Sequence, residues 1–435
     1  MRTVLFWGLV PGLIVLVFAG GCAMSEQAEG EADTTAVQSA PDPRGPELAP
    51  QKEQVRTVQL YRGNDERNFP VTSLRSGDPL TLEFDLLQTD GQPLSVYFYH
   101  ADQSWERDLS PSQYLESYHN DKLLEYRRSQ GTVVPYVHYE YQFPNDDIRF
   151  RLSGNYVLRV TTQGRPDSVL FERAFFVTDE AGNLQVGTEA IAVPGQRQQS
   201  VRPVARFSPP SELRGDPFGY TTCFVRNGRL PGTRCEGRPL LGRQPTLAFE
   251  LDRSRAFDPT TADYTVDLAN LRAGPGIENT DRTVTPFQVL LEPDYAQFSD
   301  RDLTSSLNGQ IVVRGALGGY ANPALRAEYV RTTFAFVPPN ERPLSEEVRV
   351  GGSFSGMDPR RGTRLQWRAD RRRYEGSVLL KQGQYQYFYS STDPVLQRVI
   401  QQSQLRRRNT YTVFVYYRDP SVRTDRLLRV TSIQR

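Results

Sequence analysis

The sequence has few of the residues from which metal sites and histidine-based catalysis are built. Only three of its 435 residues are His and only three are Cys, which leaves little material for zinc clusters, haem attachment or imidazole acid–base work. It also lacks the patterns H-E-x-x-H, G-x-S-x-G, G-x-x-x-x-G-K-S/T and G-x-G-x-x-G. Zinc-protease, serine-hydrolase, phosphate-loop and dinucleotide chemistry therefore lack their signatures, and we expect neither an enzyme nor a cofactor.

The chain also lacks an excess of charge of either sign. Lys and Arg number 52 and Asp and Glu 51, for a net charge of +1, so the strong basic field typical of nucleic-acid binding is missing and we expect no nucleic-acid partner. Hydrophobic residues make up 38% of the chain, an ordinary value for a folded protein. The length predicts two or three domains.

The first 22 residues predict export. Arg2 precedes an apolar stretch, residues 4–19, that contains Pro11 and is short for a helix crossing about 30 Å of hydrocarbon. It is typical of a secretory signal. The small residues before Cys22 resemble a bacterial lipobox, so residues 1–22 are expected to be a lipoprotein signal peptide with Cys22 lipidated and held at the outer membrane. A plain periplasmic form and an uncleaved anchor are the alternatives.

Residues 23–50 predict a disordered linker. The segment carries six acidic residues, one basic residue and four Pro, and such a composition cannot bury enough apolar surface to fold. We expect a flexible leash that lets an anchored protein work away from its membrane.

The two remaining cysteines, Cys223 and Cys235, predict a disulfide, because a pair of thiols in an oxidising compartment is normally bonded. Asn227-Gly228 lies between them and favours a tight hairpin, which the bond would clamp. A redox or metal pair is the less favoured alternative, because the spacing is not C-x-x-C and no His is near.

The body of the chain predicts β-structure. Apolar and polar residues alternate through many short runs, as in Leu80 to Leu86, and Gly and Pro separate them. We therefore predict a mainly β protein of tandem β-sandwich domains: residues 51–180, 200–337 and an immunoglobulin-like domain of the early-set type at 345–435. A short crossover helix is expected at Pro111–Tyr118. Tyr385, Tyr387 and Tyr389 are expected to form a wall of the last domain's core.

Two constellations suggest chemistry, and for each a structural reading is favoured. His100, His119 and His138 could form a metal site with Asp102 or Asp108, although half-buried histidines that make hydrogen bonds are the better explanation. Asp146 and Asp147 could belong to a carboxylate pair of a glycosidase, but their place after Pro144-Asn145 is more typical of a turn. No metal ligand or catalytic residue is assigned.

The last domain offers a second hypothesis. Its segments around Val348–Phe354, Leu365–Trp367 and Gly383–Tyr387 resemble early-set immunoglobulin modules related to glycogen binding. Such modules stack sugars on exposed Trp, so Trp367 could contact a glycan. A Trp in a sandwich strand is more often a core residue.

Several segments spread along the chain resemble the plug protein family of the bacterial type IX secretion system. They are Tyr99–Trp105, Asp108–Leu115, Phe143–Arg149, Leu152–Tyr156, Val225–Arg229, Leu380–Tyr385, Tyr416–Pro420 and Thr424–Leu427. The matched family residues include His100, Asp102, Trp105, Asn145, Asp147, Arg418 and Asp419. The sequence departs from the family at Ala101, where members often carry Cys, in the Cys223–Cys235 pair and in the long leash.

The resemblance implies a periplasmic protein that closes the inner mouth of the outer-membrane translocon barrel when no substrate passes. The translocon barrel and, through the lipid on Cys22, the outer membrane are then the expected partners. The alternative is a lipid-anchored glycan-binding protein that uses the C-terminal domain.

Overall fold

Strands dominate the described part of the chain, as the alternation predicted. The structure is a computed structural model, and it describes residue 42 and residues 45–75, 78–194, 199–241, 245–258, 263–296, 307–315, 322–401 and 409–435. The signal at 1–22, with Cys22, and most of the expected linker lie outside these residues. None of the helices in these ranges has the length and apolar character needed to cross a membrane.

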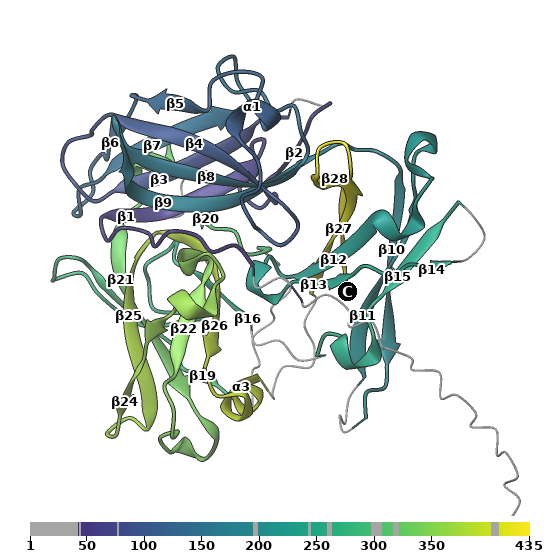
Figure 1. Cartoon of the computed structure of the whole chain (residues 1–435). Coiled ribbons are helices and arrows are strands. Elements are labelled where there is room, and N and C mark those ends of the chain that lie inside the picture. Colours follow the sequence, from purple (N-terminus) through teal and green to yellow (C-terminus); the bar gives the residue numbers. More distant parts are fainter. Residues whose placement is uncertain are drawn as a thin grey trace, which may run out of the picture. The chain divides into compact units, whose positions relative to one another are not determined.

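The first sandwich consists of two sheets ordered β1-β3-β7-β6 and β2-β9-β8-β4-β5. Its elements are β1 (Val55–Arg62), β2 (Val71–Ser73), β3 (Leu80–Leu86), β4 (Leu94–Ala101), α1 (Pro111–Tyr114), β5 (Asn120–Leu123), β6 (Arg127–Arg128), β7 (Val137–Phe143), β8 (Gly154–Thr162) and β9 (Arg165–Thr178). Figure 1 shows them in purple and blue. Leu82 and Phe84 from one sheet share a core with Phe98 and Phe171 from the other.

The second sandwich pairs strands from the middle of the chain with strands from its end. Its sheets are β10-β11-β15-β14 and β13-β12-β27-β28. The strands are β10 (Asn183–Ile191), β11 (Ser200–Ser208), β12 (Tyr220–Arg226), β13 (Arg234–Glu236), β14 (Leu240–Leu241), β15 (Leu247–Glu250), β27 (Thr410–Asp419) and β28 (Thr424–Gln434). Short 3-10 turns lie at Ser211–Leu213, Pro217–Gly219, Leu230–Gly232 and Arg253–Arg255. Phe207, Phe224, Phe249 and Val413 share its core.

The third sandwich holds the remaining strands. Its sheets are β16-β26-β22-β23, with β20 on β26, and β17-β18-β21-β25-β24, with β19 on β21. The elements are β16 (Asp263–Asp267), β17 (Ile277–Asp281), β18 (Gln288–Leu291), β19 (Asp294–Tyr295), β20 (Val312–Val313), α2 (Pro323–Arg326), β21 (Tyr329–Val337), β22 (Arg349–Gly352), β23 (Thr363–Arg364), β24 (Gln366–Arg368), β25 (Arg373–Lys381), β26 (Gly383–Ser390) and α3 (Pro394–Gln401). Further 3-10 turns are Pro339–Glu341, Ser353–Ser355 and Pro359–Arg361.

The aromatic row of β26 is buried as predicted. Tyr385, Tyr387 and Tyr389 are each at most 1% exposed and belong to the core of the third sandwich. The hydroxyls of Tyr387 and Tyr389 donate to Asp294 Oδ2 over 2.7 and 2.8 Å. The row is therefore a structural wall whose polar ends are satisfied inside the protein.

The strand pairing differs from the predicted domain boundaries. β27 and β28 were placed in an immunoglobulin-like domain at 345–435, but β27 pairs with β12 and both strands lie among the teal strands in Figure 1. Strands β16 to β21 were placed in the domain at 200–337, but β16 and β21 pair with β26 and β25. The alternation marks a strand but not its partner, because pairing joins segments far apart in the sequence.

Two local expectations change, and a third is confirmed. The helix at Pro111 ends at Tyr114, four residues before the predicted end at Tyr118. Asn227 and Gly228 do form a turn with positive φ at both positions, but one 3-10 turn separates it from β13, so the hairpin is longer than predicted. The predicted disulfide between Cys223 and Cys235 is present and joins paired residues of β12 and β13.

Candidate functional site at the junctions between the sandwiches

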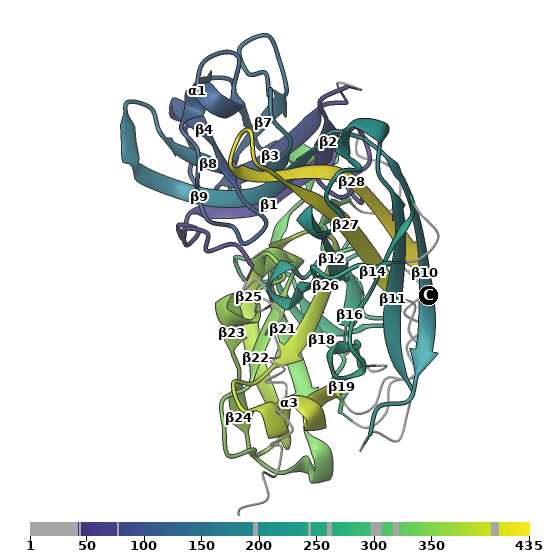
Figure 2. The same ribbon diagram turned by 45° about the vertical axis from the view of Figure 1, so that its right-hand side comes forward.

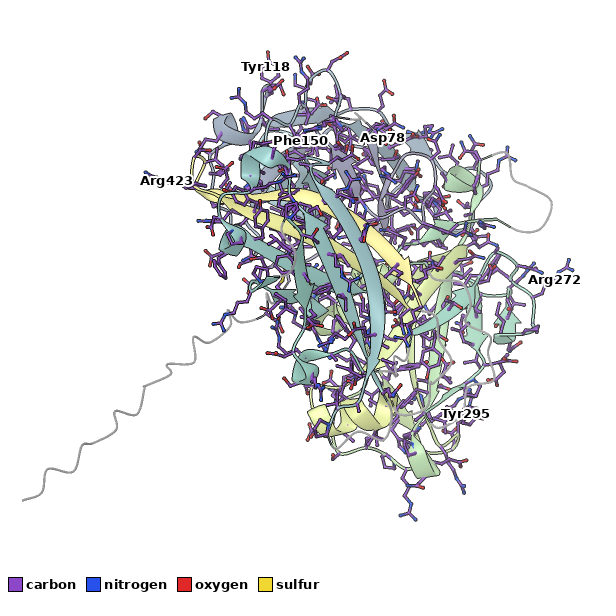
Figure 3. All side chains as sticks on the ribbon, turned by 90° about the vertical axis from the view of Figure 1, so that its right-hand side faces the viewer. Asp78, Tyr118, Phe150, Arg272, Tyr295 and Arg423 are labelled. Atoms are coloured by element: carbon purple, nitrogen blue, oxygen red, sulfur yellow. A yellow bond between two sulfur atoms is a disulfide. The ribbon has the colours of Figure 1, made fainter. Side chains whose placement is uncertain are left out.

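The loop after β4 joins the first sandwich to β27 and β28. Gln103 N donates to Asp425 Oδ2 over 3.3 Å. Tyr416 OH, on β27, donates to Asn155 Oδ1 over 2.7 Å, and both side chains are buried. These contacts connect segments that are more than 260 residues apart, and we call this region the hairpin junction. Figure 3 labels Arg423 at the turn between β27 and β28.

His100 holds the loop in place from inside the first sandwich. Its side chain is fully buried, and Nδ1 donates to Asp108 Oδ1 over 2.8 Å. Thr424 Oγ1 donates to the other oxygen of Asp108. Burial alone would raise the pKa of Asp108, but the hydrogen bonds from His100 and Thr424 hold it below its usual value. Gly154 has positive φ and lies against the ring, where a Cβ would clash with Nε2.

Asp102 and Trp105 shape the same loop. Asp102 Oδ1 accepts hydrogen bonds from Ser104 N and Glu106 N over 2.8 and 3.0 Å, so its carboxylate closes a local turn. The Trp105 ring lies edge-on to Phe176, with centroids 5.5 Å apart. These rings belong to an apolar cluster that combines both sandwiches: Phe176, Cys223, Val225, Phe414, Tyr416 and Leu427.

Arg418 and Asp419 belong to the hairpin side of the junction. Asp419 Oδ2 accepts from Arg426 Nη1 over 3.0 Å, and Arg426 Nη2 also donates to Asp179 Oδ2 over 2.7 Å. Burial alone would raise the pKa of Asp419, but its hydrogen bonds and Arg426 hold it below its usual value. Arg418 is 56% exposed and reaches Asp425 at 3.4 Å. Five of the seven family residues named from the sequence therefore meet at this junction.

Asn145 and Asp147 lie elsewhere. Asn145 Oδ1 accepts from the backbone N of Asp147 and Ile148 over 3.0 and 2.8 Å, and its amide donates to Asp121 Oδ2 over 3.2 Å. These bonds close the turn after β7 within the first sandwich.

A buried charge cluster joins the first sandwich to the third. Lys381 Nζ, on β25, donates to Asp85 Oδ2 over 2.6 Å, and Tyr329 OH donates to the same oxygen over 2.7 Å. His138 Nδ1, on β7, donates to Asp85 Oδ1 over 2.8 Å. Lys381 also donates to Ala324 O over 2.6 Å. The side chains of Asp85 and Lys381 are each 1% exposed, so water does not screen this pair.

Burial and neighbouring charges shift the pKa values in this cluster. Burial alone would raise the pKa of Asp85, but Lys381 and the bond from His138 hold it below its usual value. Burial alone would lower the pKa of His138, but bonds to Asp85 and to Glu83, 3.3 Å from Nε2, hold it above its usual value. Burial lowers the pKa of Lys381. Asp85 and Glu83 on β3 thus lie beside His138 of the same sandwich, and Asp85 also pairs with Lys381 of the third sandwich.

This cluster was not predicted from the sequence. The alternation of β3 places Asp85 on the polar face of the strand, and the third sandwich covers that face instead of water. Lys381 directly follows the apolar run Val378–Leu380. A fully buried Lys is almost always paired, but the sequence does not show that Lys381 is buried.

The segment at residues 45–50 corrects the predicted linker. These residues and Asp42 form a strap that contacts all three sandwiches: Cys235 N donates to Asp42 Oδ1, Arg361 donates to Leu48 O, and Ala49 N donates to Glu172 Oε2. A cavity of about 110 Å³ lies beside it, lined by Pro46, Phe69, Leu230 and Met357 among others. Backbone hydrogen bonds and buried Pro46 order a segment whose composition predicted disorder.

Trp367 lines a cleft on the third sandwich. It is half-buried on β24, and its ring lies edge-on to Tyr374 with centroids 5.1 Å apart. Tyr374 OH accepts from Leu344 N over 2.8 Å. Glu347 and Arg364 line the same cleft of about 600 Å³. The Trp is thus both packed against the core and present at a surface cleft.

The histidines do not converge. His100 and His138 bind different carboxylates, and the His119 ring lies 5.8 Å from that of Tyr97. Within the described ranges, no group of three or more His, Cys, Asp and Glu side chains could hold a metal ion. Hydrogen bonds to Asp425, Asn155 and Asp108 join the hairpin junction, and the buried pair of Asp85 and Lys381 joins the first sandwich to the third.

Solved structures show that the arrangement of strands occurs in another protein. A crystal structure of a hypothetical protein from Parabacteroides merdae matches with a TM-score of 0.77 and 22% identity, over 89% of this chain and 99% of that chain. Alpha-2-macroglobulins from Salmonella and from E. coli match with a TM-score of 0.18 each, at 12% and 10% identity, over 89% and 91% of this chain and 23% of each of theirs. The first match shows the fold. The TM-scores of the other two are too low to show a shared fold.

Sequence comparison places the first sandwich in a family. No curated protein matches the chain. The family model described as type 9 secretion system plug protein 1st domain matches residues 55–179. This range runs from the first residue of β1 to the residue after β9. The first sandwich is therefore the first domain of a type 9 secretion system plug protein, and the family predicted from the sequence segments is confirmed.

Proposed function

We propose that this protein is a non-catalytic plug that closes the periplasmic opening of the type IX outer-membrane translocon barrel. The family match of residues 55–179 carries the proposal, because it assigns the first sandwich to secretion plugs. The partner would be the translocon barrel, and the site of action the periplasmic side of the outer membrane.

The two junctions support this function because a seal needs a rigid body. If the domains of a plug moved independently, they would lose conformational entropy each time the plug bound the barrel. This loss would weaken binding. Here Asp85 and Lys381 join the first sandwich to the third, and Tyr416 and Asn155 join it to the second. A stable and still releasable contact with a barrel should bury on the order of 1,200 Å² or more.

Lipidation of Cys22 completes the proposal. Residues 23–41 would then connect the membrane to Asp42, where the strap begins, and could span about 60 Å when extended. A tether of that length keeps the plug at high local concentration near the barrel, so even a weak contact closes again quickly after release. Mass spectrometry of the mature N-terminus tests the lipid.

Purification of the translocon from its native membrane tests the plug assignment. We expect this protein to co-purify with the barrel and its deletion to make the outer membrane leakier to small solutes. Failure to co-purify, together with unchanged leakage after deletion, would exclude the assignment.

A second candidate function is glycan binding by the third sandwich. The observation that favours it is the cleft in which half-buried Trp367 lies beside Glu347 and Arg364, because sugars stack on aromatic rings and bond to charged groups. Titration calorimetry with soluble glycans would compare Trp367→Ala with the control Tyr118→Ala, which removes a ring that is 71% exposed. Loss of sugar affinity in a folded Trp367 variant favours this function, whereas a lowered melting temperature without any sugar binding favours a core role.

A further inference from the structure

A cleft of about 880 Å³ lies between the first and third sandwiches and carries an excess of positive charge. Its lining includes Arg56 of β1, Arg173 of β9, Arg331 of β21 and Arg361 at the end of a 3-10 turn. Among the described residues that line it, Glu53 is the sole acidic one. We call it the arginine cleft. Figure 2 shows β1 and β9 of the first sandwich above β21 and β25 of the third.

Arg173 has no carboxylate counter-ion among the described residues. Its side chain is half-buried, Nη1 donates to Glu172 O over 2.9 Å, and Nη2 donates to Gln51 Oε1 over 2.7 Å. Both acceptors are uncharged. The Glu172 carboxylate pairs with Arg107 and Arg159 instead, each at 2.7 Å. The charge of Arg173 is therefore not neutralised by the groups that position its side chain.

A second cation lies near Arg173. Burial and the positive charge of Arg361 lower the pKa of Arg173. Arg361 donates to Leu48 O, and its Nε lies 3.5 Å from Asp358 Oδ2. Arg360 already holds that carboxylate, because it donates to both oxygens over 3.0 and 2.9 Å. An anion beside the guanidinium groups of Arg173 and Arg361 would relieve their repulsion.

The size and lining of the cleft indicate which anion fits. Guanidinium groups bind carboxylates through paired N–H donors. Clefts of about 300–1,000 Å³ hold whole organic ligands, and a single inorganic ion needs much less space. The walls also carry half-buried apolar side chains, among them Leu87, Phe354 and Leu379. A peptide can present carboxylates and apolar side chains together, which matches both features of the lining.

We propose that the arginine cleft binds an acidic peptide segment of a partner protein. The segment places carboxylates beside Arg173, Arg361 and Arg331 and an apolar side chain next to Phe354. Because these contacts are largely electrostatic, the affinity falls as the salt concentration rises. This inference goes beyond the plug function, since it names a ligand class and does not require that the barrel supplies the peptide.

Fluorescence anisotropy with a labelled synthetic peptide tests the ligand class. In the probe, Glu alternates with Leu or Ala, and the control peptide has Gln in place of each Glu. We expect the wild type to bind the Glu peptide about tenfold or more tightly than the Gln peptide, because charge-assisted hydrogen bonds are stronger than neutral ones. Added salt should reduce this difference.

Two Arg variants test the place of binding. Arg173→Met removes a charge without a carboxylate partner, so we expect it to fold and to lose about tenfold or more in affinity for the Glu peptide. Arg331 is exposed, so Arg331→Met keeps the fold and should lose a smaller part of the affinity. The control is Arg372→Met, because Arg372 is 71% exposed and lies outside the cleft. Thermal unfolding checks the fold of each variant.

The possible results decide the inference without the barrel. It is wrong if the wild type does not bind the Glu peptide or binds the Gln peptide equally well. It is also wrong if inorganic phosphate binds as tightly as the Glu peptide, because the cleft then holds a lone oxyanion. Wild-type affinity in the folded Arg variants would place the binding elsewhere. If Arg173→Met unfolds, Arg331→Met alone decides, and none of these results tests the plug function.

Discussion

At the scale of single residues, the junction between the first and third sandwiches relies on charged side chains that are almost fully buried. Asp85 accepts hydrogen bonds from Lys381, Tyr329 and His138, and these come from both sandwiches. Such a buried pair gains little over an apolar pair of the same volume, but removing one partner leaves an uncompensated charge. The cluster therefore favours one relative placement of the two sandwiches over others.

Lys381→Met tests this role. The substitution leaves Asp85 buried without its ammonium partner, and we expect a loss of about 3–5 kcal/mol in the free energy of unfolding. Arg371→Met is the control, because Arg371 pairs with Glu375 at 3.2 Å but is 51% exposed, and such surface pairs contribute up to about 1 kcal/mol. Denaturant unfolding compares the two. Equal losses would show that the cluster does not hold the interface.

Glu66 predicts a pH dependence of stability. Burial, the main cause, raises the pKa of Glu66 to about 7, although Gln59 Nε2 and Val313 N donate to its carboxylate. Between the unfolded pKa of about 4.3 and the folded one, the folded state binds more protons, so this group lowers stability as the pH rises through that range.

Glu66→Gln removes the titration while keeping the shape of the protonated acid. We expect its stability relative to the wild type to rise by about 1–3 kcal/mol between pH 4 and pH 8. The exposed Glu125→Gln should show no such trend. Unfolding at several pH values measures the difference, and parallel pH profiles for wild type and Glu66→Gln would contradict the assignment.

Residue types alone predicted some of these environments and not others. The three Tyr of β26 were predicted to be buried because aromatic rows in strands usually pack. His100 was predicted to be a hydrogen-bonding residue, and it is bonded to Asp108. Asp85 was not found, since the alternation around it is the same whether water or a second domain covers its polar face.

At the scale of elements, β27 and β28 have two roles. They complete a sheet of the second sandwich through β12, and their turn carries Thr424 and Asp425 to the loop after β4. Because β12 and β27 are about 190 residues apart, residues near the end of the chain complete this sheet. The predicted strands were correct here, but their partners depend on packing that no local pattern records.

The disulfide acts on this sheet. Cys223 and Cys235 are separated by 12 positions, and a loop of this length restricts the unfolded chain by about 3 kcal/mol. We expect the variant with Cys223→Ser and Cys235→Ser to have a free energy of unfolding about 3 kcal/mol lower than that of the oxidised wild type. Its melting temperature should be lower as well. Added reductant should lower the melting temperature of the wild type and leave the double variant unchanged. A double variant as stable as the oxidised wild type would contradict a structural role.

At the scale of the whole molecule, polar contacts join three sandwiches and a strap. The strap begins at Asp42 and contacts each sandwich, so the end of the expected tether is fixed to the folded body. Composition predicted neither the strap nor the interleaved second and third sandwiches, because both depend on contacts between distant segments. The family segments did predict the plug family, which the match at residues 55–179 confirms.

Electrical conductance of the purified translocon barrel in a planar lipid bilayer tests the central claim most directly. If the protein is a plug, adding it on the periplasmic side should reduce the conductance of the open barrel, and washing it out should restore the current. Heat-unfolded protein should have no effect. A barrel whose conductance stays the same at saturating concentrations of the folded protein would contradict the account.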